Sequence, residues 1–150
     1  MLFRSRENVT NVSIKGAEAG VEYQVNNRLK LIGSYTFNES RIDAFAKKPD
    51  LENKFLKYVP QHAASASIFW KSELVNTTIR GIYKGKQFGN DANTVALDPY
   101  FTLDIQLSRQ FWDHYTVSLD VKDVFDNRHM ETMHYLSPGR TITARAALRF

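Results

Sequence analysis

The sequence predicts an all-β fold, and three observations carry that prediction. Apolar and polar residues alternate along seven stretches of the 150-residue chain, as they do in strands with one buried face. Most of these stretches are about 10 to 13 residues long, whereas strands of soluble domains are usually about 5 or 6 residues long. Short and long connections alternate between the stretches, and no segment has a convincing helical pattern.

Each expected strand has one apolar and one polar face. In residues 28–38, every second residue from Leu29 to Phe37 is apolar, aromatic or glycine, and Ile32 is the one apolar residue on the other face. In residues 100–111, Arg109 is the only charge on the apolar face. The seven expected strands cover residues 15–25, 28–38, 61–71, 75–88, 100–111, 115–126 and 141–150.

The lengths of the strands and of their connections favour a transmembrane antiparallel β-barrel. A tilted strand needs about 9 to 11 residues to cross a bilayer. Short turns are expected near residues 26–27, 71–74 and 112–114, and longer polar loops at residues 39–60, 89–99 and 127–139. Short turns on one rim and long loops on the other are typical of outer-membrane barrels.

The position of the aromatic residues supports the same choice. Polarity alone fits either a membrane barrel or a soluble β-sandwich, because both have strands with one apolar face. Most aromatic residues of the apolar faces, however, lie near strand ends, where the girdles of a membrane barrel place them. They are Tyr23, Tyr35, Phe37, Trp70, Tyr83, Phe101, Phe111, Trp112, Tyr115 and Phe125.

Composition excludes several classes of protein. The chain has no cysteine, which excludes disulfide scaffolds and thiolate chemistry. Its mean hydropathy of -0.41 and the absence of an apolar run of about 20 residues exclude a helical membrane span. The net charge of +4 is scattered rather than clustered, so no nucleic-acid partner is expected. The first six residues lack the apolar core of a signal peptide, so we expect either a cytoplasmic protein or a piece without its amino-terminal part.

Several local motifs resemble one family. They are Ile14-Lys15-Gly16-Ala17-Glu18 at a strand start, Gly33-Ser34-Tyr35-Thr36-Phe37, Tyr58-Val59-Pro60-Gln61-His62 at a strand entry, and the aromatic-glycine strand exit from Tyr83 to Phe88. The most specific is the ending, with Val121-Lys122-Asp123-Val124-Phe125-Asp126-Asn127, then Pro138-Gly139-Arg140-Thr141, then a terminal phenylalanine. In this order and spacing they resemble the carboxyl-terminal third of TonB-dependent outer-membrane receptors, which are 22-stranded transporters with a plugged lumen. Two residues depart from the family pattern: Asp123 stands where asparagine is usual, and His129 where a tyrosine commonly follows.

The resemblance implies that residues 1–150 form about seven strands of the larger barrel, with the plug domain and the TonB-binding segment missing from the chain. An open sheet of seven long strands would leave two unpaired edges in lipid, which is costly. We therefore expect a fragment or a truncated reading frame, with Met1 an internal or artificial start.

The function implied by the resemblance is uptake without bond chemistry. No Ser, His and Asp residues have the spacing of a catalytic site, and Glu18 and Glu22 are expected on a wet lumen face. Neither an enzymatic activity nor a cofactor is expected. The resemblance implies an outer-membrane receptor of a Gram-negative bacterium that takes up a ferric siderophore or another iron complex, driven by the TonB complex through the missing part.

Three alternatives stay open. The first is uptake of copper, haem, cobalamin or a carbohydrate by the same mechanism. The second is a structural or adhesive barrel without transport, and the third is a soluble β-sandwich that binds a ligand between its sheets.

Three groups of residues are candidates for binding. The cationic residues of the first long loop are Arg41, Lys47, Lys48, Lys54 and Lys57, which could attract an anionic chelate or lipopolysaccharide phosphates, although a solvated loop is also expected to be charged. His129, Met130, Met133 and His134 combine imidazoles and thioethers, ligands that suit copper. Ala146, Leu148 and the terminal Phe150 resemble the signal read by the barrel-assembly machinery.

Overall fold

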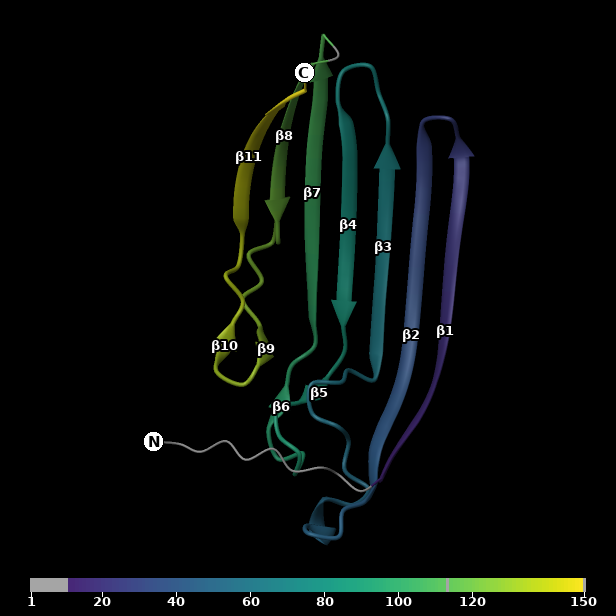
Figure 1. Cartoon of the computed structure of the whole chain (residues 1–150), viewed down its shortest axis with the longest axis vertical. Helices are drawn as coiled ribbons and strands as arrows, with labels where there is room; N and C mark the ends of the chain where they lie inside the picture. The colour runs from purple at the N-terminus through teal and green to yellow at the C-terminus, as the bar shows by residue number, and fades with distance from the viewer. Residues whose placement is uncertain (1–10, 113, 150) are drawn as a thin grey trace.

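A computed structural model describes residues 11–112 and 114–149. Its main element is a seven-stranded antiparallel sheet in the order β1-β2-β3-β4-β7-β8-β11. The strands are β1 (Asn11–Asn26), β2 (Leu29–Ala44), β3 (His62–Trp70), β4 (Asn76–Lys84), β7 (Tyr100–Phe111), β8 (Tyr115–Lys122) and β11 (Thr141–Leu148), shown in Figure 1. The all-β prediction and the seven long strands are confirmed.

Four shorter strands and a single-turn helix lie in the long connections. The 3-10 helix η1 (Pro49–Leu51) follows β2, β5 (Gln87–Phe88) pairs with β6 (Ala96–Leu97), and β9 (Met130–Thr132) pairs with β10 (Tyr135–Leu136). None of these five elements was predicted, because each is too short to show a period. Within the described residues, no helix is long and apolar enough to cross a membrane.

Several predicted strand boundaries were wrong. The first two strands extend to Asn11 and Ala44, well into the predicted loop 39–60, because polar residues pair there across the ladder, as Ser13 does with Arg41. The strand predicted over residues 75–88 is split, because after Lys84 the chain pairs with β6 instead of continuing along β3. The strand predicted to reach residue 126 ends at Lys122, where Asp123 adopts a φ of 50° that a strand does not allow.

The two kinds of connection lie at opposite ends of the sheet, as predicted (Figure 1). The short turns are held by local hydrogen bonds. Asn26 Oδ1 accepts hydrogen bonds from the N–H groups of Arg28 and Leu29 at 2.8 and 3.0 Å, and Ser72 Oγ accepts one from the N–H of Val75 at 3.0 Å. Such side-chain turns need no support from the rest of the fold.

Strand register gives the sheet one apolar and one polar face. One row crosses all seven strands with a single apolar residue from each; its members are Tyr23, Leu31, Ile68, Ile79, Ile105, Val121 and Ile142. We call this side the outward face. The neighbouring row on the opposite side, the inner face, contains Gln24, Lys30, Phe69, Thr78, Gln106, Asp120 and Thr143.

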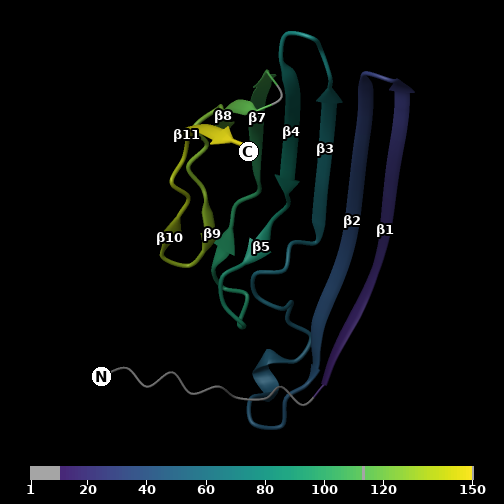
Figure 2. The same ribbon diagram turned by 45° about the horizontal axis from the view of Figure 1, so that its top comes forward.

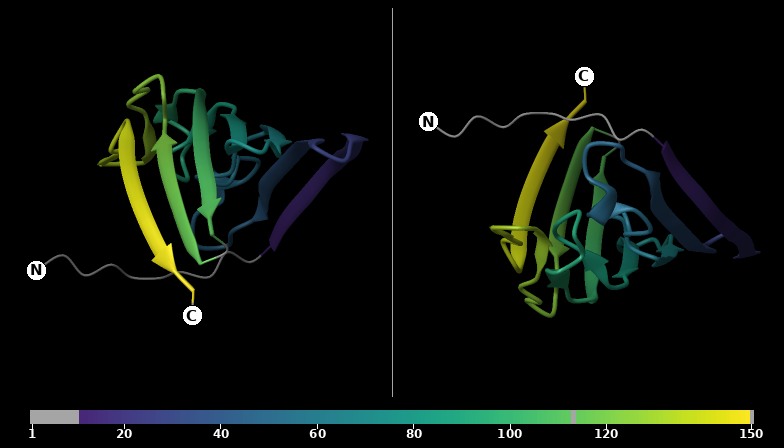
Figure 3. Two further views of the ribbon diagram at one scale, coloured as in Figure 1. Left: turned by 90° about the horizontal axis from the view of Figure 1, so that it is seen from above. Right: turned by 90° about the horizontal axis from the view of Figure 1, so that it is seen from below.

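The sheet curves into an open trough with β1 and β11 at its two edges (Figure 3). The buried hydrophobic residues of the described chain are Ile42, Phe45, Leu51, Leu97 and Tyr100, and all belong to the loop end or the strand ends beside it. Large apolar residues of the outward face are instead exposed, including Tyr23 at 60% and Ile142 at 65%. An exposed apolar surface of this extent needs a covering environment.

Candidate ligand-binding loop layer

The three long connections form a continuous layer at one end of the sheet. We call them the first loop (residues 45–61), the second loop (residues 85–99) and the third loop (residues 123–140), and together the loop layer. Figure 2 shows the short hairpins β5–β6 and β9–β10 side by side in this layer, and β6 and β9 are in contact.

The first loop folds onto the extended end of β2. Ile42 is 1% exposed and forms a small core with Phe45 and Leu51, and Leu56 and Ala92 pack against it. The N–H of Ile42 donates to Lys54 O at 3.0 Å, and the N–H of Asn53 donates to Ile42 O at 2.7 Å. Because Ala92 belongs to the second loop, this core already joins two loops.

The carboxamide of Asn93 fastens the second loop to the first. Its Nδ2 donates to Phe55 O at 2.8 Å, and its Oδ1 accepts from Phe55 N–H at 2.6 Å. The side chain thus satisfies both backbone groups of one residue, as a neighbouring strand would. Asn93 has a φ of 57°, a conformation that asparagine tolerates better than most residues. An ion pair of 2.9 Å between Lys57 and Asp91 joins the same two loops.

Aromatic and backbone contacts fasten the second loop to the third. The ring of Tyr100, at the start of β7, stacks on His129 with 3.5 Å between centroids, and Gln87 Nε2 donates to Glu131 O at 3.1 Å. Met133 packs so closely on Gly89 that a Cβ there would lie 2.6 Å from its Cγ. The three loops are therefore linked in series.

The base of the third loop is closed by Asp126. Its Oδ1 accepts a 2.8 Å hydrogen bond from the N–H of Arg140, and this bond, together with the Arg128 and Arg140 guanidinium groups, lowers the pKa of the Asp126 carboxyl below its usual value. Gly139 lies between them with a φ of 73°, and a Cβ there would be only 2.3 Å from Asp126 Oδ1. The Pro-Gly-Arg motif of the sequence thus serves to close this loop.

The five predicted cationic residues do not act as one patch. Arg41 lies on β2 rather than in the loop, pairs with Glu39 at 2.6 Å and covers the Phe55 ring at 3.9 Å. Lys57 pairs with Asp91, and the ammonium of Lys48 lies 5.9 Å from the Phe45 ring. For Lys47 and Lys54, the described residues supply no carboxylate at ion-pair distance. These two lysines are the best candidates of the group for an anionic ligand.

The predicted soft-metal residues are spread along the β9–β10 hairpin. His129 is at its base, where its carbonyl pairs with the N–H of Ser137 at 2.8 Å, whereas Met133 and His134 form the turn. Three residues of strand separate the base from the turn by roughly 10 Å. Among the residues described, no group of three or more His, Cys, Asp or Glu side chains has the arrangement of a metal site. Metal binding by this loop stays a prediction.

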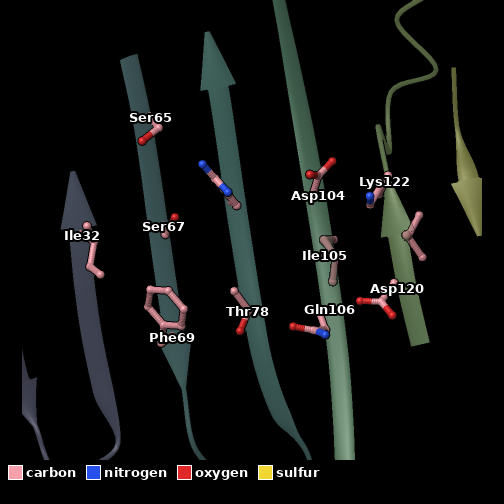
Figure 4. Close-up of a pocket in the computed structure, with 12 residues that line it drawn as sticks. Ile32, Ser65, Ser67, Phe69, Thr78, Asp104, Ile105, Gln106, Asp120 and Lys122 are labelled. Atoms are coloured by element: carbon pink, nitrogen blue, oxygen red, sulfur yellow. The ribbon is translucent and has the colours of Figure 1, made fainter. Parts of the chain in front are cut away.

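The inner face carries a hollow of about 410 Å³ over the middle of strands β3, β4 and β7 and the adjoining part of β8. Figure 4 shows Ser65 and Ser67 of β3, Asp104 of β7, and Asp120 and Lys122 of β8 around it, with Ile32 at one side. The carboxylate of Asp120 pairs with Arg145 at 3.0 Å, and Asp104 Oδ1 accepts the N–H of Asp123 at 2.9 Å. Glu22, predicted on this face, pairs with Lys30.

Two of the three residues of the predicted assembly signal can be located. Ala146 and Leu148 lie on β11, opposite Val117 and Tyr115 of β8, on the face predicted for them. Phe150 lies outside the described residues. The assembly signal therefore stays a prediction.

Sequence reasoning missed Asn93, Asp126 and Tyr100, which hold the loop layer together. Asn93 sits in a polar loop among other turn-forming residues, where nothing distinguishes a residue that reaches another loop. Asp126 was noticed only as part of a motif, and Tyr100 as a strand residue. Their roles depend on contacts between segments far apart in the chain.

Comparison with known proteins agrees with this architecture. Residues 4–124 match the family model described as TonB dependent receptor-like, beta-barrel. The iron-regulated outer membrane virulence protein of Vibrio cholerae serotype O1 is 25% identical over 143 residues, covering 90% of this chain and 21% of that protein. The chain thus spans about a fifth of the length of the curated relatives that it matches.

Solved structures show the same fold. The siderophore receptor PiuA of Acinetobacter baumannii superposes with a TM-score of 0.79 at 18% identity, covering 92% of this chain and 22% of that one. The ferric citrate transporter FecA superposes with a TM-score of 0.80 at 16% identity, and the match covers 93% of this chain and 24% of that one. The copper transporter OprC superposes with a TM-score of 0.75 at 16% identity, and the match covers 93% of this chain and 23% of that one.

The fold and the family model together define a segment of a large β-barrel of the receptor class. The chain belongs to the TonB-dependent receptor β-barrel family, a family of receptors and transporters rather than of enzymes.

Replacing Asn93 with alanine should separate the first and second loops. The change leaves both backbone groups of Phe55 without their partners, a local cost of about 1 to 3 kcal/mol. Hydrogen exchange of the Phe55 amide in the full-length receptor should become faster. Asn90→Ala is the matched control, because Asn90 bonds to Thr94 and Val95 within its own loop. Equal exchange of Phe55 in both variants would contradict the role given to Asn93.

The third loop should loosen in acid through Asp126. Because the pKa of the Asp126 carboxyl in the folded protein lies below its usual value, the charged carboxylate stabilises the loop near neutral pH, and this contribution is lost as the pH falls through the lowered pKa. Cleavage of the third loop by pepsin should therefore rise as the pH falls below about 4, the usual pKa range of an aspartate. Asp126→Asn should weaken this dependence, whereas Asp98→Asn in the second loop should not.

Proposed function

We propose that the full-length protein is an outer-membrane receptor that takes up a ferric siderophore or another iron complex, with energy supplied by TonB. Membership of the family supports energy-coupled uptake. Iron is supported by the names of similar proteins, which include an iron-regulated outer membrane protein, a siderophore receptor and a ferric citrate transporter. In this proposal the plug domain and the TonB-binding segment belong to the part of the receptor outside this chain.

The observation that carries the proposal is the division of the sheet into a continuous apolar face and a polar, hollowed face with a loop layer at one end. The outward row, one apolar residue from each strand, suits lipid contact. The hollow, with Arg80, Asp104 and Lys122 among its lining residues, suits a wet interior. The loop layer then lies on the outer rim, where a ligand arrives first.

Within the loop layer, we assign first contact with the ligand to exposed or half-buried side chains that have no ion-pair partner among the described residues. Lys47 and Lys54 offer charge for an anionic chelate, and Tyr135, 75% exposed at the end of the third loop, offers an aromatic surface. The lipopolysaccharide around the barrel and the assembly machinery are the other partners expected of a protein in this membrane.

The membrane placement predicts opposite effects for neighbouring residues of β7. Ile105→Lys puts a charge in the middle of the outward face and should cost about 2 to 4 kcal/mol of barrel stability in the membrane. Gln106→Lys puts the same charge on the inner face, beside Asp120, and should be tolerated. The measurement is the fraction of full-length receptor that migrates as a folded, heat-modifiable barrel from outer-membrane extracts. Equal loss in both variants, or in neither, would be inconsistent with lipid contact at Ile105.

A binding panel tests the substrate. The full-length receptor is titrated with ferric citrate, ferric hydroxamate and ferric catecholate chelates, and with haem, cobalamin and Cu²⁺. We expect saturable binding of one ferric chelate, and uptake by cells that stops when the TonB-binding segment is deleted. Binding of only a non-iron ligand would reject the iron proposal but keep the receptor. Lys47→Gln together with Lys54→Gln should weaken the binding of an anionic chelate more than the binding of a neutral one.

The third loop is tested in the same panel. Replacing Met130 and Met133 by leucine should leave uptake intact if the predicted soft-metal residues play no part. A selective loss of Cu²⁺ binding in that variant would support the metal prediction instead.

A further inference from the structure

Arg109 is the one charged residue on the apolar face of β7, and it has no evident role in the sheet. Its neighbours in the strand on the same face are Leu107 and Phe111, and its cross-strand partner is Val117, 49% exposed. A charge facing hydrocarbon costs several kcal/mol unless it reaches the interface or finds a partner. The position of Arg109 therefore needs an explanation.

The guanidinium of Arg109 points toward the short-turn end of the sheet. Its Cζ lies 4.8 Å from the centroid of the Phe111 ring, two residues closer to the turn. At a rise of about 3.4 Å per residue, Arg109 is roughly 7 Å from the end of the strand. That distance lets a long side chain reach the headgroup level by extending along the surface.

Two further polar donors lie at the same end of the sheet, linked to Phe111 by ring contacts. Trp112 is 82% exposed, and its ring centroid lies 6.2 Å from that of Phe111. Tyr115 is 49% exposed, and its ring lies edge to face with that of Trp112, with 6.2 Å between the centroids. Tryptophan and tyrosine at the headgroup level place their rings against the acyl chains and their N–H or O–H groups in the polar layer. The three residues thus present a guanidinium, an indole N–H and a phenol O–H on one surface.

Among the described residues, Arg109 also has no carboxylate at ion-pair distance. Two other arginines near this end of the sheet have carboxylate partners: Arg28 pairs with Glu73 at 3.1 Å, and Arg145 pairs with Asp120 at 3.0 Å. In the part of the chain that the structure describes, the guanidinium of Arg109 contacts the face of the Phe111 ring and no carboxylate. An anion from outside the protein would complete the site.

We propose that Arg109, Trp112 and Tyr115 bind the phosphate of a membrane phospholipid in the leaflet next to the short turns. The proposal rests on the membrane placement proposed above, in which the short turns face the periplasm and the adjacent leaflet is phospholipid. A planar guanidinium matches two phosphate oxygens at once, and the exposed rings of Trp112 and Tyr115 hold the glycerol region in place. The site anchors the rim of the barrel at one depth in the membrane.

The test is native mass spectrometry of the full-length receptor, extracted from outer membranes in mild detergent, with retained phospholipid counted per folded barrel. Arg109→Gln should lower the affinity of this one site about fivefold, the effect expected of one arginine near an anionic lipid surface, so that fewer barrels retain the additional phospholipid. Arg109→Lys should keep part of it, because an ammonium attracts phosphate without the bidentate geometry. Arg80→Gln, which removes the same charge from the inner face, is the control and should change nothing.

The outcomes separate this site from the proposed function. If Arg109→Gln retains as much phospholipid as the unaltered receptor while both are folded in the outer membrane, the site is rejected and the receptor proposal stands. A fall in retained lipopolysaccharide with unchanged phospholipid would also reject it, because the site would then face the other leaflet. Absence of the unaltered receptor from the outer-membrane fraction would reject the membrane placement itself.

Discussion

The structure depends on one constraint: an antiparallel ladder of seven strands in which side chains alternate between two faces. Within each pair of neighbouring strands the register fixes the partner of every residue, and a slip by one residue would move each apolar side chain of that strand to the polar face. The row from Tyr23 to Ile142 is the result. Because the buried apolar residues of the described chain lie at the loop end, the sheet relies on its surroundings to cover the outward face.

The loop layer is a consequence of where the strands end. β2 continues to Ala44 and carries Ile42 beyond the end of β3, so the first loop has an apolar anchor on which to fold. β8 stops at Lys122, and the following Asp123 turns the chain so that Asn127 Nδ2 donates to Phe101 O at 3.0 Å. Because the strands end at different heights, the three loops can pack together at one end of the sheet. The hydrogen bonds of Asn93 and the stacking of Tyr100 on His129 join the loops there.

The sheet was largely predictable from the sequence because alternation is a local signal. Alternation correctly predicted all seven strands and the division of their connections into turns and loops. It also placed Ile32 on the polar face and gave the bounds of the strand Tyr100–Phe111 as the structure has them. The extension of β1 and β2 was not predictable, since residues 39–44 have mixed polarity and pair only because the partner strand is present. The contacts between loops could not be predicted for the same reason. Asn93 and Phe55 are 38 residues apart, so their hydrogen bonds leave no local pattern in the sequence.

The two ends of the sheet are stabilised in different ways, and this difference matters for function. The short turns use bonds within a few residues, such as those of Asn26 and Ser72, so each hairpin fixes its own register. The long loops use bonds between loops, so a change in one alters its neighbours but leaves the ladder intact. A sheet built in this way can vary its loop end without losing strand register, because the register is set by the turns at the opposite end and by the pairing along the strands. The same fold is accordingly found in solved structures that are only 14 to 18% identical to this chain.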